Sequence, residues 1–250
     1  MISLLRPSAA LLLAIALFPL HASAQGAQTP WPDEQGMVQR LAACAACHGS
    51  RGEGAPGAEY FPHLAGKPAG YLFAQMQGFR DGRRHYPQMV YLMRNWNDAW
   101  LSRIALFYAA QPIPELHSQA AGKLDAQGAA RANTLVREGD AQAGLPPCAA
   151  CHGEKLEGLE PGIPALAGLP MDYLIAQLGG WLTGARHSLA PDCMAQIVSK
   201  LQPGDIRLVA TYLSALPATP EDRPAPEGSR EPPLACGGIG QFDAAPQASP

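Results

Sequence analysis

The sequence predicts an all-α fold built from two tandem helical domains. The pentapeptide Cys-Ala-Ala-Cys-His occurs at residues 44–48 and again at residues 148–152. The residues after each copy also repeat, with apolar positions at helical spacing. No run of alternating apolar and polar residues is long enough for a sheet. Each repeat is therefore expected to be a separate set of helices joined by loops.

The repeat extends beyond the pentapeptide. Its offset is 104 residues at the pentapeptide and 102 residues downstream of it, where residues 61–66 match residues 163–168. Single residues then match in order: Tyr71, Leu72, Gln75, Gly82, Arg84 and His85 correspond to Tyr173, Leu174, Gln177, Gly184, Arg186 and His187. Residues so different in chemistry do not recur in register by chance, so the chain contains a duplicated domain.

Helices are expected at corresponding places in the two repeats. The stretches 33–43 and 125–138 precede the pentapeptides. Pro68 and Pro170 stand where a second helix begins, because proline is well suited to the first turn. A third helix is expected around 98–110 and 204–216, each ended by proline.

The pentapeptide indicates covalently bound haem. Its two thiols lie one helical turn apart and can add to the two vinyl groups of one haem, and the adjacent His is carried to the iron. A zinc site would need two more ligands at finger-like spacing, and a dithiol redox site would need a βαβ setting, and the sequence has neither pattern. We therefore expect two covalently bound haem c groups, one on Cys44, Cys47 and His48 and the other on Cys148, Cys151 and His152.

The sixth ligand of each iron separates an electron carrier from an enzyme. A Met thioether raises the potential and closes the iron, whereas an open position admits small ligands. Met89 follows His48 by 41 residues, and Met194 follows His152 by 42 residues. The iron ligands are therefore expected to be His48 with Met89 and His152 with Met194.

Other sulfur ligands remain open. Met93 lies close enough to Met89 to compete for the first iron, whereas Met76 falls in a helix pattern and is expected in the core. Cys193 as a thiolate ligand would lower the potential of the second iron sharply. An even remainder of two cysteines in an oxidising compartment instead favours a disulfide between Cys193 and Cys236.

Residues around the ligands are candidates for contacts with the haem. The carbonyl groups of Pro62 and Pro164 are placed to accept the second ring N–H of each ligating His. Three histidines suit a bis-His scheme, although surface or propionate-contacting roles are preferred: His63, His85 and His187. Three arginines are candidates to pair with propionates, although arginines after a helix are more often solvated: Arg83, Arg84 and Arg186.

The rest of the chain divides by composition. Residues 1–24 have the features of a cleavable signal peptide, with a short positive start, an apolar run and the cleavage site Ala22-Ser23-Ala24. We expect domains at 25–111 and 125–216, a linker at 112–124, and a Pro- and Ala-rich tail at 217–250 that is mostly extended or disordered.

No stretch is apolar for about 20 residues, so no transmembrane helix is expected. The formal net charge of −3 argues against a nucleic-acid partner.

Residues 33–216 resemble the cytochrome c4 family of exported diheme proteins. The resemblance rests on three segments. In the first repeat they are Cys44-Ala45-Ala46-Cys47-His48-Gly49, and Phe61-Pro62-His63-Leu64-Ala65-Gly66 followed by Tyr71-Leu72. In the second repeat, Gly144-Leu145-Pro146-Pro147-Cys148 leads into Ala149-Ala150-Cys151-His152-Gly153. It implies two tandem class I cytochrome c domains, each wrapped around one covalently bound haem, and His/Met ligation through Met89 and Met194. The residues at 96–98 and 201–203, both extra cysteines and the tail depart from the family pattern.

The resemblance implies a periplasmic electron carrier of the respiratory chain and not an enzyme. Its partners would be redox proteins: a quinol-oxidising complex or a dehydrogenase as donor, and a terminal oxidase as acceptor, with any membrane contact peripheral and through these partners. One alternative is the cytochrome subunit of a dehydrogenase, which usually has a third haem motif and an anchor. The other is a diheme enzyme of the peroxidase or thiosulfate dehydrogenase type, which only Cys193 favours.

Overall fold

The structure of the protein is a computed structural model that describes residues 33–55, 61–116, 124–239 and 242. The predicted signal peptide and positions 117–123 of the predicted linker lie outside these residues. The chain separates into two units, Met1–Trp31 and Pro32–Pro250, and all described residues belong to the second.

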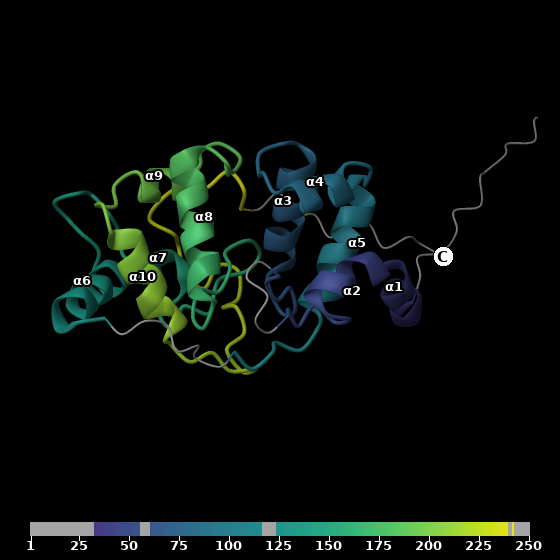
Figure 1. Cartoon of the computed structure of the whole chain (residues 1–250), viewed down its shortest axis with the longest axis horizontal. Helices are drawn as coiled ribbons and strands as arrows, with labels where there is room; N and C mark the ends of the chain where they lie inside the picture. The colour runs from purple at the N-terminus through teal and green to yellow at the C-terminus, as the bar shows by residue number, and fades with distance from the viewer. Residues whose placement is uncertain (1–32, 56–60, 117–123, 240–241, 243–250) are drawn as a thin grey trace, which may run out of the picture. The chain divides into compact units, whose positions relative to one another are not determined.

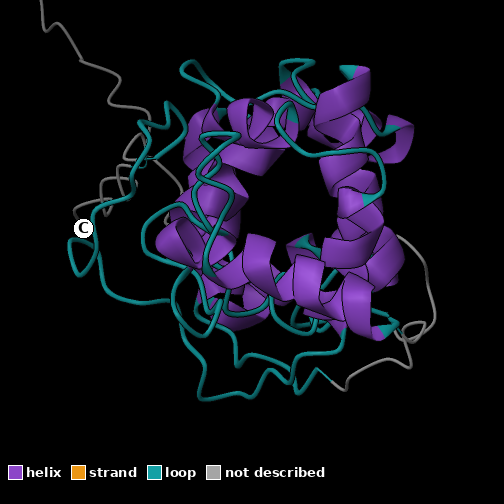
Figure 2. Cartoon of the chain, turned by 90° about the vertical axis from the view of Figure 1, so that its left-hand side faces the viewer, coloured by secondary structure: helices purple, strands orange, loops and turns teal. Residues whose placement is uncertain are grey.

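The helices of the described residues form two sets that follow the duplicated pattern, and Figure 2 shows no strand among them. The first repeat forms α1 (Glu34–Arg40), α2 (Ala42–His48), α3 (Ala69–Arg80), α4 (Pro87–Met93) and α5 (Asp98–Ala109) (Figure 1). The second repeat forms α6 (Ala126–Arg137), α7 (Cys148–His152), α8 (Met171–Thr183), α9 (Cys193–Val198) and α10 (Asp205–Ser214). The predicted all-α fold is therefore confirmed.

Most helices begin close to the predicted positions. Pro68 and Pro170 are the N-caps of α3 and α8. The carboxylate of Asp125 caps α6 by accepting a hydrogen bond from the N–H of Gly128 at 2.7 Å. The single helix predicted at 33–43 is wrong: the chain turns at buried Leu41, which separates α1 from α2 and leaves the first pentapeptide on a helix of its own.

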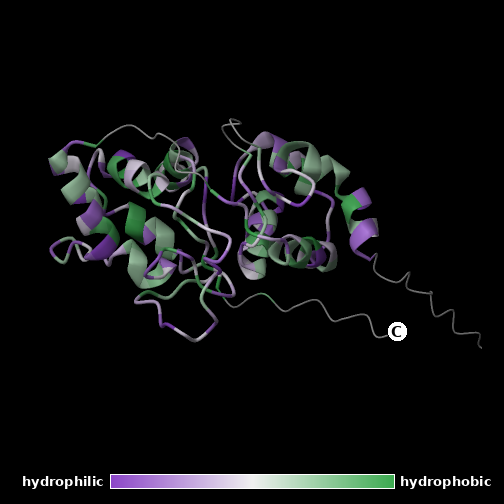
Figure 3. Ribbon diagram, turned by 90° about the horizontal axis from the view of Figure 1, so that it is seen from below, coloured by the Kyte–Doolittle hydropathy of each residue, from purple (hydrophilic) through white to green (hydrophobic). Residues whose placement is uncertain are grey.

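Each repeat buries its own hydrophobic core. In the first repeat α3 packs on α4 and α5, and in the second α10 packs on α6 and α8. Figure 3 shows hydrophobic stretches on the helices of both repeats. The first core includes Met37, Leu72, Phe79, Leu101 and Ile104, and the second includes Leu135, Val136, Leu174, Val209 and Leu213. Two separate helical cores agree with two tandem cytochrome c domains.

The tail differs in part from its prediction. Its described residues form no helix, as expected, but they are packed against both repeats and not disordered. Ala225 pairs with Leu159 of the second repeat, and the ring of Phe242 lies 5.5 Å from that of Phe73 in the first repeat. Over the part of the chain that the structure describes, no helix is long and apolar enough to cross a membrane.

Candidate functional site

The two pentapeptides place their histidines in equivalent surroundings. The side chains of His48 and His152 are both buried, with 8% of their surface exposed. Nδ1 of His48 donates a hydrogen bond to the carbonyl of Pro62 at 2.8 Å, and Nδ1 of His152 donates to the carbonyl of Pro164 at 2.8 Å. Both predicted proline acceptors are therefore confirmed.

These hydrogen bonds determine the tautomer of each histidine. A carbonyl oxygen only accepts, so Nδ1 carries the proton and Nε2 keeps a free lone pair. Burial also lowers the pKa of His48 and of His152, which keeps both rings neutral. A neutral imidazole whose other nitrogen is held by a fixed acceptor is well prepared to bind a metal.

The second repeat contains a cavity of about 180 Å³ that faces its pentapeptide. Cys148, Cys151 and His152 line this cavity, and so does Met194. Most of the remaining wall is apolar, with Leu135, Leu145, Leu166, Leu169, Leu174, Ile197, Leu201, Val209 and Leu213. Burial raises the pKa of Cys148 to about 11, so this thiol is protonated at neutral pH. Two thiols, a neutral imidazole and a thioether around one apolar space fit a c-type haem.

Hydrogen bonds to the Asp192 side chain fix the loop that precedes Met194. The carboxylate of Asp192 caps α9 by accepting from the N–H of Ala195 at 3.0 Å, and it also accepts from the N–H of Ser188 at 2.7 Å. The indole of Trp181 donates to the same carboxylate at 3.2 Å. One side chain therefore ties the start of α9 to α8 and to the loop between them.

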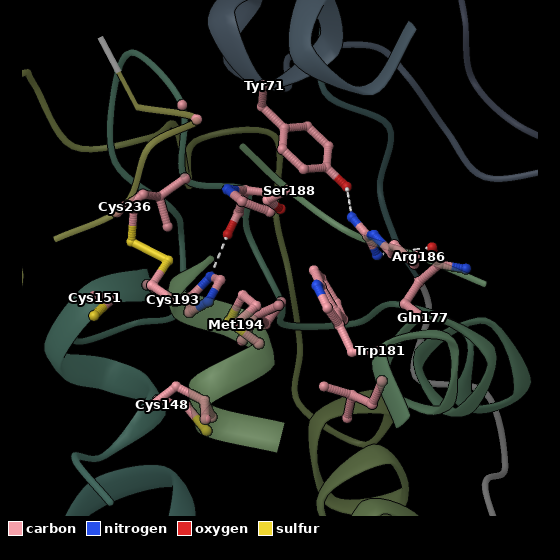
Figure 4. A pocket seen from close by; sticks show the side chains of 18 of the residues that line it. Tyr71, Cys148, Cys151, Gln177, Trp181, Arg186, Ser188, Cys193, Met194 and Cys236 are labelled. Carbon is pink, nitrogen blue, oxygen red and sulfur yellow. Dashed lines mark hydrogen bonds between the residues drawn. A yellow bond between two sulfur atoms is a disulfide. The ribbon is translucent and has the colours of Figure 1, made fainter. Parts of the chain in front are cut away.

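The two remaining cysteines form the predicted disulfide, between Cys193 and Cys236. Figure 4 shows it beside Met194, and both cysteines line the cavity. Because its sulfur is bonded to Cys236, Cys193 is not available as a thiolate ligand in this structure.

The first repeat has the same kinds of residue around its pentapeptide. Cys44 and Met89 both pack against the first core. The hydroxyl of Tyr108, in the same core, is buried and makes no hydrogen bond with any described residue. Burial, together with the neighbouring Cys44 thiol, raises the pKa of Tyr108. Cys44 of the first pentapeptide thus packs on the same core as Met89 and Tyr108.

The competing methionines are placed differently from Met89. Met93 lies on α4 with Met89, but it is only 3% exposed and belongs to the first core. Met76 packs against the same core from α3, as predicted. Ligation by Met89 and by Met194 stays a prediction.

The other candidate residues differ in how far they are exposed to solvent. His85 and His187 are exposed, in line with the preferred surface role, whereas His63 is buried. The expectation of solvated arginines is wrong for Arg186, which is 7% exposed. Arg186 is buried because it has acceptors at the contact between the repeats, including the Tyr71 hydroxyl at 3.5 Å (Figure 4).

Sequence reasoning did not identify the residues of the first repeat that line the cavity of the second. Residues from the first repeat in its wall include Lys67, Tyr71, Gln75 and Arg84. Lys67 stands where the second repeat has Leu169, so a search for mismatches between the repeats could have found it.

Comparisons with known proteins agree with this arrangement. The family model described as Cytochrome c matches residues 35–103. Cytochrome c4 of Pseudomonas aeruginosa is 32% identical to the chain over 179 residues, which is 71% of this chain and 85% of that protein. The chain belongs to the cytochrome c4 family. As a member of the cytochrome c4 family, it is a diheme electron-transfer protein with two covalently bound haem c groups.

The chain is also similar to two further proteins. The thiosulfate dehydrogenase electron acceptor of Stutzerimonas stutzeri is 33% identical over 204 residues, which is 81% of this chain and 93% of that protein. The crystal structure of reduced recombinant cytochrome c4 from Pseudomonas stutzeri has a TM-score of 0.61 and 28% identity, over 74% of this chain and 100% of that chain.

Proposed function

We propose that this cytochrome c4 carries single electrons between redox proteins of the periplasm, with each iron bound by one His and one Met. The observation that carries the proposal is the cavity of the second repeat, where neutral His152 and Met194 face the same apolar space. A thioether and an imidazole on one iron raise its potential and leave no open position for a substrate. By the matching positions in the repeat, His48 and Met89 take the same roles at the first haem.

The spectrum of the oxidised protein tests the ligation. Met ligation of ferric haem gives a weak near-infrared charge-transfer band, and this band is expected with an intensity that corresponds to two haems. High-spin absorption from either haem would instead reveal an open iron and favour an enzyme.

A quinol-oxidising complex or a dehydrogenase is the proposed electron donor, and a terminal oxidase the proposed acceptor. Among dehydrogenases, one for thiosulfate is favoured by a specific observation, the likeness to an electron acceptor of that enzyme in Stutzerimonas stutzeri. In this reaction thiosulfate is oxidised by the dehydrogenase, and each haem of the carrier accepts one electron.

Haem reduction followed by visible absorption distinguishes these roles. The oxidised protein is mixed with thiosulfate, first alone and then with a purified thiosulfate dehydrogenase. Reduction only in the second mixture is expected for a carrier that this enzyme supplies. Reduction by thiosulfate alone would make the chain itself the enzyme. If neither mixture reduces the haems but a quinol-oxidising complex with quinol does, thiosulfate dehydrogenase is the wrong donor.

A further inference from the structure

Positively charged side chains line the cavity of the second repeat, and no negatively charged side chain lines it among the residues that the structure describes. Its cationic side chains are Lys67, Arg83, Arg84 and Arg186, and no Asp or Glu is among the described residues that line it. Arg83 has its own partner, the carboxylate of Asp81 at 3.0 Å. The other three cations make no ion pair with a carboxylate of the described residues. Buried charges of one sign are costly unless an anion joins them.

Within the described ranges, Arg84 and Arg186 donate hydrogen bonds only to neutral groups. Arg84 donates to the side-chain oxygens of Gln75 and Gln177, and Arg186 donates to the same two oxygens, each at 2.8 Å. These hydrogen bonds position the guanidinium groups without neutralising them.

Lys67 is the least satisfied of the three cations. Its side chain is buried, with 5% exposed, and no hydrogen bond from its ammonium group is found within the described ranges. Burial lowers the pKa of Lys67 to about 8. Although burial of Tyr71 acts in the opposite direction, Arg186, Arg84 and Lys67 together lower the pKa of the Tyr71 hydroxyl to about 8. The space around Tyr71 is therefore strongly positive.

The charge of Lys67 is specific to the first repeat. Gly66-Lys67-Pro68 corresponds to Gly168-Leu169-Pro170 in the second repeat, and Leu169 is buried in the wall of the same cavity. The duplicated positions thus differ by a full charge, and that charge faces the cavity of the second repeat.

A c-type haem brings an anion, which the described residues of this wall do not supply. Its vinyl groups are used by the cysteines, and its two propionate carboxylates remain free to accept hydrogen bonds from cations. We infer that Lys67 and Arg84 of the first repeat bind a propionate of the second haem, so that this haem is held by both repeats. The cation also favours the reduced state, which has one more electron, and so raises the potential of the second haem. The inference rests on the proposed function only in placing that haem in this cavity.

The test is a spectroelectrochemical titration of the full-length diheme protein. Lys67→Leu gives the first repeat the residue of the second, and Lys67→Arg keeps the charge. Lys155→Met is the control, because it removes a charge from an exposed side chain of the second repeat. The wave of the second haem is identified beforehand as the one that Met194→His lowers.

Lys67→Leu is expected to shift the reduction equilibrium of the second haem about tenfold toward the oxidised form, which is about 59 mV for one electron. The first haem should shift less, Lys67→Arg should keep the original potential, and Lys155→Met should shift neither wave by this amount. If Lys67→Leu fails to incorporate haem, Lys67→Gln replaces it, with the same expected shift.

An unmoved second wave in Lys67→Leu, with the near-infrared band intact, would overturn the inference and leave the proposed function standing. Equal shifts of both haems, or an equal effect of Lys155→Met, would also overturn it, since either indicates a general effect of charge. Absence of the near-infrared band from the unmodified protein would instead refute the proposed His/Met ligation.

Discussion

Arg84 and Arg186 occupy equivalent positions in the two repeats and pair with each other in an antiparallel β-bridge. Each arginine donates to the glutamine of its own repeat and to that of the other, Gln75 and Gln177. The contact between the repeats is therefore made by like residues on both sides, as in an isologous interface between two subunits. Duplication of one domain supplied both halves of this contact.

Replacing one glutamine should weaken this contact. Gln177→Met removes an acceptor from both arginines, and leaving such donors unsatisfied costs about 1–3 kcal/mol of unfolding free energy. Denaturant unfolding followed by circular dichroism measures the loss. Gln127→Met, at an exposed position of α6, is the matched control and should change stability little. Equal losses of unfolding free energy in the two variants would show that Gln177 does not stabilise the contact between the repeats.

A second polar contact should stabilise the second repeat internally. Arg131 of α6 donates to both carboxylate oxygens of Asp205 at the start of α10, at 3.2 and 2.9 Å. The Asp205 side chain is 5% exposed, so Arg131→Ala leaves a buried carboxylate without its cation and should cost about 1–3 kcal/mol. Arg207→Ala, at an exposed position of α10, is the control in the same unfolding assay. Unchanged stability of Arg131→Ala would contradict this prediction.

Long helices of the fold could be predicted from the sequence, and short ones could not. The helices α3, α5, α6, α8 and α10 have several turns of apolar residues at helical spacing. Only about two turns exist in α4 and α9, which is too little for a period to be recognised. Their starts were marked only by Pro87 at the first turn and by the capping carboxylate of Asp192. The helices that carry Met89 and Met194 were therefore missed although both methionines were singled out.

Within the candidate site, contacts inside one repeat could be predicted and contacts between repeats could not. The pairing of His48 with Pro62 recurs in register as His152 with Pro164, so duplication itself indicated it. The cavity wall that Lys67 contributes depends on how the two repeats pack, and no local pattern encodes that packing.

The disulfide should hold the tail against the second repeat. Cys193 and Cys236 are separated by 43 residues, and closing such a loop stabilises the folded state by about 4 kcal/mol in the chain-entropy model. In the variant with both Cys193→Ser and Cys236→Ser, limited proteolysis should cleave residues 217–239 faster than in the unmodified protein. Mass spectrometry of unreduced peptides checks the bond itself. Two free thiols, or equal cleavage rates, would argue against this role.

Removing a proposed methionine ligand should open one iron only. Met89→Ala is expected to lower the potential of the first haem and let it bind carbon monoxide, and Met194→Ala should do the same at the second. Carbon monoxide difference spectra and redox titration measure both effects. Met93→Leu is the control for the first repeat, because Met93 is buried in the core and leucine nearly keeps its volume, at a cost below about 1.5 kcal/mol. If Met93→Leu opens the first iron while Met89→Ala leaves it closed, the sixth ligand of the first iron is Met93. The two repeats would then use methionines at different positions.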